Sequence, residues 1–200
     1  MKKKHRYYWS ILGILISLAM PSGPAFAETT PVGQIISGAI SQTSQTLYYD
    51  PAYTQIPYPN GDLPSDRGVC TDVVIRAFRK GGVDLQALVH QDMQKNFSAY
   101  PKTWGLKQTD ANIDHRRVPN LMTFFARKGK SLPVTQQADD YLPGDVVAWR
   151  LSNGLLHVGL VTDRPTFDTK RRLVVHNIGQ GARLEDVLFA FQLIGHYRYF

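Results

Sequence analysis

A single cysteine, Cys70, stands in the stretch DRGVCTDVV, and its thiol could act as a nucleophile or as a soft metal ligand. The residues after it have helical spacing and end at two glycines: Val73, Val74, Ala77 and Phe78 share a face, and Gly81 and Gly82 follow. We therefore expect Cys70 in the first turn of a helix, on its buried side. There the helix dipole and free backbone N–H groups would lower the thiol pKa and could receive an oxyanion. Alternatively, Cys70 is an unreactive cysteine that serves only as a small residue of the core.

A nucleophilic thiol needs a base, and two histidines lie on predicted strands. His157 falls in GDVVAWRLSNGLLHVGLVTD, which predicts a strand at 145–151, a turn at 152–154 and a return strand at 155–162. His176 falls in RRLVVHNIGQG, which predicts a third strand. Three adjacent antiparallel strands could place both rings over the helix of Cys70, and Gly159 would let that helix approach closely. Each histidine alone would also fit an ordinary sheet position.

Two further histidines are expected to be outside any site. His90, in LQALVHQDMQ, is predicted to lie at the surface near the end of an amphipathic helix. His196, in IGHYRYF, is predicted to be a structural strand residue. Residues 48–64, rich in Tyr and Pro, predict an ordered loop.

A dense polar segment, NIDHRRVPN at residues 112–120, precedes another predicted helix. It contains Asp114, His115, Arg116 and Arg117, and we expect it to roof a cleft and contribute to substrate binding. A guanidinium group binds a carboxylate through two parallel hydrogen bonds. Arg116 or Arg117 is therefore a candidate for binding a carboxylate. An internal Asp–Arg network or a solvated loop would explain the same residues.

The amino-terminal residues 1–27 have the pattern of a secretory signal peptide. Basic residues come first, an apolar run of about ten residues follows, and Ala25-Phe26-Ala27 gives a cleavage pattern. The run is too short for a membrane span, which needs roughly 20 residues, and we expect none after cleavage. Removing 1–27 leaves 19 basic and 16 acidic residues, a formal charge of +3 instead of +7, which argues against a nucleic-acid partner.

The mature chain is then expected in the periplasm or outside the cell. Residues 28–46 are predicted to be a flexible lead, or alternatively a short docking helix. Residues 47–200 have a length that suits one domain.

The order of these motifs resembles the NlpC-type, papain-like cysteine peptidases and amidases of bacterial envelopes. The matching residues are Cys70, Gly144-Asp145-Val146-Val147, His157-Val158-Gly159-Leu160 and His176. A second resemblance covers nearly the whole mature chain. RGVCTDVVIRAFR, DLQALVHQDM, NIDHRRVPNL, GDVVAW, VVHNIGQG and GHYRYF are similar to an exported bacterial family catalogued as domain of unknown function 1287. This second family names no reaction.

The NlpC resemblance implies an α+β, papain-like fold, with the Cys70 helix packed on an antiparallel sheet. It implies Cys70 as nucleophile, His157 as base and His176 as orienting group, with Asn177 as a rival orienter that should point to the opposite sheet face. Amide bonds of peptidoglycan peptides would be the substrate, and no cofactor is implied. The flanks of the cysteine, Val69 and Thr71, depart from that family's small polar residues.

Three other functions remain open at this point. A non-catalytic envelope binding module could keep the cleft without the chemistry. A thioester-based acyltransferase would use the same residues. Cys70, His157 and His176 could also bind zinc, although no short ligand spacing supports it.

Overall fold

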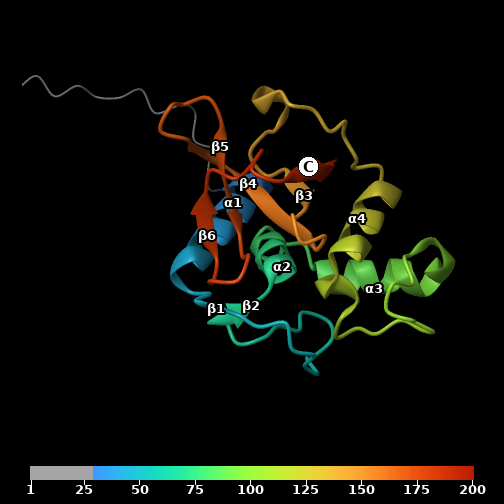
Figure 1. Ribbon diagram of the computed structural model, residues 1–200. Helices are drawn as coiled ribbons and strands as arrows, with labels where there is room; N and C mark the ends of the chain where they lie inside the picture. The colour runs from blue at the N-terminus through green and yellow to red at the C-terminus, as the bar shows by residue number, and fades with distance from the viewer. Residues whose placement is uncertain (1–28) are drawn as a thin grey trace, which may run out of the picture.

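The fold is built on a five-stranded antiparallel sheet of order β6-β5-β4-β3-β7, with helices on one side (Figure 1). The computed structural model describes residues 29–200, so the expected signal peptide at 1–27 lies outside the described residues. The helices are α1 (Pro31–Ser41), α2 (Cys70–Lys80), α3 (Leu85–Lys95) and α4 (Val118–Arg127). The main sheet contains β3 (Val146–Arg150), β4 (Leu156–Pro165), β5 (Arg172–His176), β6 (Arg183–Glu185) and β7 (Gln192–Tyr197).

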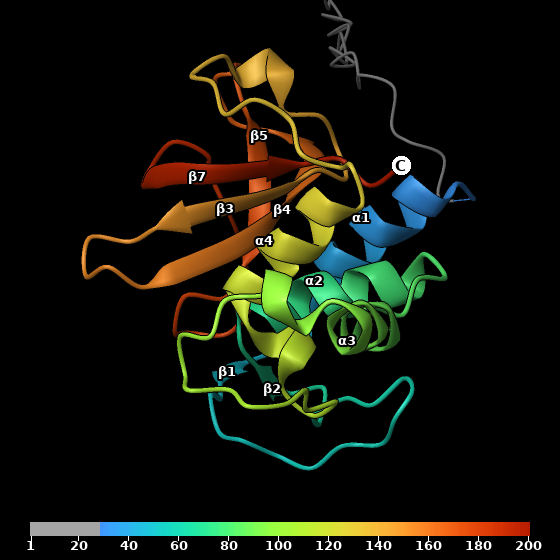
Figure 2. The same cartoon turned by 90° about the vertical axis from the view of Figure 1, so that its right-hand side faces the viewer.

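Shorter elements connect these layers. The strands β1 (Tyr48–Tyr49) and β2 (Arg67–Gly68) pair in parallel below the helices, and most of the expected loop at 48–64 runs between them (Figure 2). The 3-10 turns are η1 (Gln42–Ser44), η2 (Phe97–Ala99), η3 (Asp114–Arg116) and η4 (Ala138–Asp140). Within residues 29–200, no helix has the length and apolar character that crossing a membrane requires.

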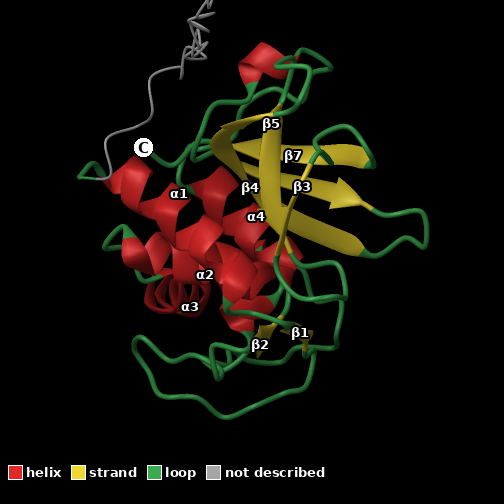
Figure 3. Ribbon diagram, turned by 90° about the vertical axis from the view of Figure 1, so that its left-hand side faces the viewer, coloured by secondary structure: helices red, strands yellow, loops and turns green. Residues whose placement is uncertain are grey.

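Both faces of the main sheet are buried. Helices α1, α2, α3 and α4 form the larger core with one face, to which the sheet contributes Val146, Ala148, Val158, Leu160 and Val175. The opposite face has a smaller core of its own, made by Tyr141, Val147, Trp149, Val161, Val174 and Leu188. Figure 3 shows the helices gathered on one side of the strands. The expected α+β class, with the Cys70 helix packed on an antiparallel sheet, is confirmed.

The expectation of a flexible lead at 28–46 is wrong. Its alternative, a short helix, is what the structure has, and this helix belongs to the core. Thr30 caps α1 through a hydrogen bond from the Gly33 N–H at 3.0 Å, and Pro31 occupies the first turn. Ile35 is 1 % exposed and packs with α2. A Cβ on Gly38 would lie 2.7 Å from the Lys80 Cβ, so the two helices approach closely there. Residue 46 is therefore not the edge of the folded unit.

Candidate active site

Cys70 is the first residue of α2, as its spacing predicted, and its position is fixed by the first turn. Asp72 accepts a hydrogen bond from the Val69 N–H at 2.7 Å and pairs with the Arg116 guanidinium at 3.0 and 3.1 Å. The Thr71 hydroxyl donates to the Arg116 carbonyl at 3.0 Å. The helix start is thus joined to η3, and the cysteine backbone has little freedom.

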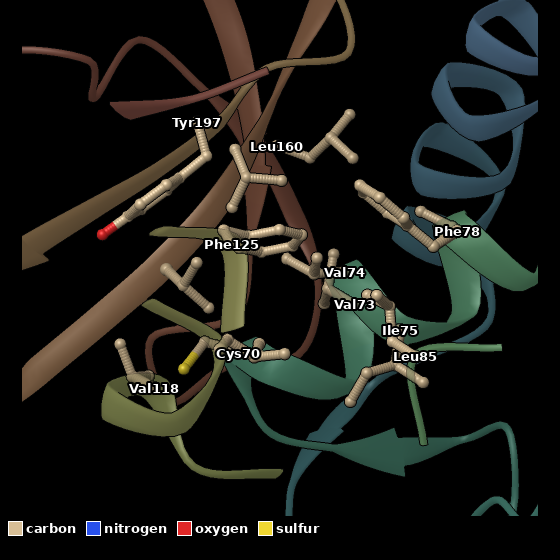
Figure 4. Close-up of a cluster of buried hydrophobic side chains, with 14 of the residues drawn as sticks. Cys70, Val73, Val74, Ile75, Phe78, Leu85, Val118, Phe125, Leu160 and Tyr197 are labelled. Atoms are coloured by element: carbon tan, nitrogen blue, oxygen red, sulfur yellow. The ribbon is translucent and has the colours of Figure 1, made fainter. Parts of the chain in front are cut away.

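Burial determines the protonation of the Cys70 sulfur. The residue is 6 % exposed, and its sulfur points toward Val118 at the margin of the apolar core (Figure 4). Burial raises the pKa of the Cys70 thiol to about 12, and the charge of Asp72 adds to this. Backbone N–H groups of Val158, Thr71 and Cys70 itself lower it, but less. The expected low-pKa thiolate is therefore wrong for the free protein, because desolvation outweighs the helix terminus.

His157 and His176 are brought together on adjacent strands, β4 and β5. Nε2 of His157 lies 2.9 Å from Nδ1 of His176, and Nε2 of His176 lies 2.9 Å from a carboxylate oxygen of Glu185. Burial, and then the neighbouring His176, lower the pKa of His157 to about 3. Burial also lowers the pKa of His176, although the hydrogen bond to Glu185 opposes it. Both rings are neutral at pH 7.

The two rings lie on the sheet face that carries Trp149, not on the face that the helices cover. Trp149 stacks on His157 with ring centroids 5.6 Å apart and planes 24° apart. A Cβ on Gly159 would lie 3.0 Å from two Trp149 ring carbons and 2.8 Å from a methyl carbon of Val174. The missing side chain at Gly159 therefore admits Trp149, which corrects the expectation that it admits a helix.

Two cavities adjoin the Cys70 sulfur. The first, of about 240 Å³, is lined by His157 and Asn177 and by the turn between β3 and β4. The second, of about 500 Å³, lies toward η3 and Trp104. Tyr49, Cys70, Leu155 and Leu156 line both. His157 is the second residue of β4 and lies next to the turn that lines the first cavity. It therefore lines this cavity although its ring is on the sheet face opposite the helices.

The sulfur and the His157 ring are not yet in direct contact. Among the described residues, neither the Cys70 sulfur nor Nδ1 of His157 has a side-chain hydrogen bond. Both residues line the same cavity. Catalytic hydrogen bonds are often long in a free enzyme and shorten when substrate binds, so this spacing is compatible with proton transfer.

The polar segment at 112–120 divides into an internal half and a cavity half. Asp114 is buried against His90, with Nδ1 2.8 Å from its carboxylate, so His90 is not the surface residue expected from sequence. His115 is 1 % exposed, and neither it nor Asp114 lines the two cavities. Arg116 and Arg117 both line the larger one.

The two arginines differ in what they already bind. Arg116 pairs with Asp72 and donates to the carbonyls of Asp50 and Ala52. Arg117 lies over the Trp104 ring at 4.2 Å, and its buried Nη1 has no hydrogen-bond partner among residues 29–200. Arg117 is therefore the arginine with more unbonded donors.

Other predicted residues have structural positions. Asn177 donates to the Gly68 carbonyl at 3.0 Å, so its amide is bonded to β2 and not to His157. His196 lies in β7 with Nε2 2.8 Å from the Asp145 carboxylate, in agreement with a structural role. Of the tyrosines before Cys70, Tyr49 lines both cavities, and its pKa is raised by burial and by the nearby Cys70.

Sequence reasoning missed Trp149 and Glu185. Trp149 could have been found, because the predicted hairpin places it opposite His157, which is the observed register. Glu185 had no such signal, since its strand is only three residues long. In the described part of the chain, no three His, Cys, Asp or Glu side chains are grouped to hold a metal ion, so the zinc alternative gains no geometric support.

The sequence of this chain is similar to known proteins. Residues 36–199 match the family described as Domain of unknown function (DUF1287). The chain belongs to this family. A relative from Escherichia coli (strain K12), described as Uncharacterized protein YijF, is 58 % identical over 166 residues, which are 83 % of this chain and 80 % of the relative.

Among solved structures, a protein of low sequence identity is similar in fold. It is a Staphylococcus aureus subsp. aureus Mu50 protein described as similar to lipoprotein, NLP/P60 family. It is 13 % identical, with a TM-score of 0.44, and the match covers 90 % of this chain. The chain spans only 45 % of that protein's length.

Proposed function

We propose that the protein is a thiol-dependent amide hydrolase of the bacterial cell envelope that acts on peptidoglycan peptides. One observation carries the proposal: Cys70, at the start of α2, lines the same cavity as His157, whose other ring nitrogen is bound by His176. A nucleophile, a base and a group that orients the base are the parts that acyl transfer through a thioester requires. The leader pattern of residues 1–27 supports an envelope location.

The neutral state of the pair determines how the first step proceeds. Nδ1 of His157 takes the thiol proton as the Cys70 sulfur attacks the amide carbonyl, so proton transfer accompanies attack. His157 then gives this proton to the departing amine, which leaves a thioester on Cys70. Water attacks the thioester, releasing a carboxylic acid and restoring the thiol. An amine in place of water would make the same protein an acyltransferase.

Two donors are candidates for stabilising the oxyanion. The Cys70 N–H lies in the first turn of α2, where backbone N–H groups have no helical acceptor. The Tyr49 hydroxyl is the second candidate, because its residue lines both cavities beside Cys70. Its raised pKa keeps the phenol protonated, as a donor must be.

Arg117 is the proposed contact for a substrate carboxylate in the larger cavity. Its position on the wall of the larger cavity, over Trp104, supports this role, whereas Arg116 pairs with Asp72. Peptidoglycan stem peptides are rich in free carboxylates. The substrate would then extend from the Cys70 sulfur toward η3.

The direct test is to incubate purified cell-wall fragments with the protein and with Cys70→Ser, and to identify products by mass spectrometry. We expect cleaved peptides only with the unmodified protein. Cleavage by both proteins would mean that the sulfur is not the nucleophile. If neither protein cleaves the fragments, the hydrolase proposal is wrong.

Arg117→Gln tests the substrate contact separately. We expect KM for the cleaved fragments to rise about tenfold or more with kcat nearly unchanged, because a lost bidentate pair to a charged group costs about 1.5–3 kcal/mol. Arg164→Gln is the matched control, since Arg164 is 64 % exposed and lines neither cavity. Equal KM values for both variants would show that Arg117 does not bind the substrate.

A non-catalytic binding module is the second candidate, and the high pKa of the buried Cys70 thiol favours it. Such a module would bind cell-wall fragments and release them unchanged, and Cys70→Ser would bind them equally well. Sedimentation with insoluble cell wall, followed by product analysis, separates the two functions.

A further inference from the structure

Glu185 is a carboxylate at the outer end of the histidine pair. It lies on β6, one of the two edge strands of the main sheet, and its side chain is 47 % exposed. In the register of β5 and β6, Glu185 is opposite Val174 and Arg183 is opposite His176. The Glu185 side chain therefore reaches diagonally across the strands to Nε2 of His176, at 2.9 Å.

The type of group at each end fixes the protons between them. An ionised carboxylate can only accept hydrogen bonds, so His176 must carry its proton on Nε2. A neutral imidazole has one N–H, which leaves Nδ1 of His176 as an acceptor. That nitrogen lies 2.9 Å from Nε2 of His157, which must therefore be the donor. Nδ1 of His157 is left without a proton.

We infer that Glu185 is a positioning residue that fixes, through His176, the tautomer of His157 in which Nδ1 is free to accept a proton. The consequence for catalysis rests on the proposed function, since only this tautomer can take the proton of Cys70. The assignment of the protons rests on the two hydrogen bonds alone. The opposite chain of protons would place the Nε2 lone pair of His176 against a carboxylate at 2.9 Å, which is repulsive.

Replacing the carboxylate by an amide removes this constraint with little change in shape. In Glu185→Gln, the amide can donate to Nε2 of His176 or accept from it. When the amide donates, both histidines reverse their protons, and His157 carries its proton on Nδ1. A fraction of the molecules then has no base facing Cys70.

Nitrogen NMR of ¹⁵N-histidine-labelled protein at pH 7 reads the tautomer directly. We expect His157 of the unmodified protein to show an unprotonated Nδ1 and a protonated Nε2. In Glu185→Gln the Nδ1 signal should move toward the protonated position. Asp186→Asn is the matched control, because Asp186 is the neighbouring carboxylate but pairs with Arg171 at 2.6 Å, and its spectrum should match that of the unmodified protein.

Two results overturn the inference. One is a proton on Nδ1 of His157 in the unmodified protein, which needs no variant to fold. The other is a His157 spectrum of Glu185→Gln identical to that of the unmodified protein.

A kinetic arm separates this inference from the proposed function. With cell-wall fragments as substrate, kcat of Glu185→Gln should fall at least about tenfold with KM unchanged, since a wrong histidine tautomer costs up to about 10⁴ in a serine-protease triad. If the unmodified protein cleaves nothing, the hydrolase proposal fails while the nitrogen spectra still decide the role of Glu185. A fall in kcat with an unaltered tautomer would count against the inference.

Discussion

Cys70 is buried at the beginning of α2, and this burial predicts how its thiol reacts with small electrophiles. Because its pKa is raised to about 12, the thiolate fraction should grow about tenfold for each pH unit between pH 7 and 10. The rate of alkylation by iodoacetamide should rise in the same proportion. Mass spectrometry can follow it without ambiguity, since the chain has one cysteine.

The control for this alkylation is the same protein unfolded in urea, in which Cys70 should react as an ordinary thiol with a pKa near about 8.5. A fast rate that does not change between pH 6 and 9 would contradict the prediction. It would indicate that the sulfur is already ionised by His157.

Gly159 leaves room for the Trp149 ring, and a methyl group there should disturb the histidine beside it. In Gly159→Ala the new carbon would meet Trp149 and Val174 at 3.0 and 2.8 Å. Overpacking of this kind costs about 1–3 kcal/mol in the free energy of unfolding. Urea unfolding of Gly159→Ala and of Ser152→Ala, in the exposed turn, measures it. Equal stability of the two variants would show that Trp149 moves away freely.

At the level of elements, α1 should contribute to stability as a core helix does. Ile35→Ala removes a side chain that is 1 % exposed and should lower the free energy of unfolding by about 2–5 kcal/mol. Ser41→Ala, at the exposed end of the same helix, should change it by less than about 0.5 kcal/mol. Thermal or urea unfolding compares them. A negligible effect of Ile35→Ala would mean that α1 is not docked in solution.

The helix of Cys70 and the strands of His157 and His176 were predictable because their apolar spacing is strong. Alternation also placed His157 with Gly159 on one strand face correctly. It could not tell which face the helices cover, because both faces of the sheet are apolar and buried. The small polar composition of residues 28–46 left a flexible lead and a short helix both open, and the structure has the helix α1.

The role of Glu185 could not be predicted from the sequence either. Its contact with His176 depends on which strand pairs with β5 and in what register. Nothing local encodes that pairing, so a half-exposed glutamate on a three-residue strand looks like any surface residue.

Over the whole molecule, buried neutral histidines should make stability depend on pH. The pKa values of His115 and His157 are both lowered to about 3, chiefly by burial. Since an unfolded histidine titrates near about 6.5, the unfolded chain binds more protons between pH 6.5 and 3. Stability is therefore present above pH 6.5 and is lost as the pH falls through this window, by about 1.4 kcal/mol per pH unit for each histidine.

His115→Gln tests this dependence without touching the cavities. The charges of Arg116, Arg79 and His90 lower the pKa of His115 further, while the charge of Asp110 raises it. Urea midpoints at pH 7, 6, 5 and 4 should give a shallower loss in the variant, by about one histidine's share. Carboxylates with shifted pKa values are common to both proteins and cancel in the comparison. Equal slopes would show that His115 is charged when folded.

The chain order of the site affects how the protein is made. Residue 70 is synthesised well before the strands that carry His157, His176 and Glu185. A nascent polypeptide therefore exposes a bare sulfhydryl until its last third has been added, and oxidants or stray disulfides can reach it during that interval. Completion of β4 closes this period, so slow folding would leave the one thiol of the chain open to modification for longer.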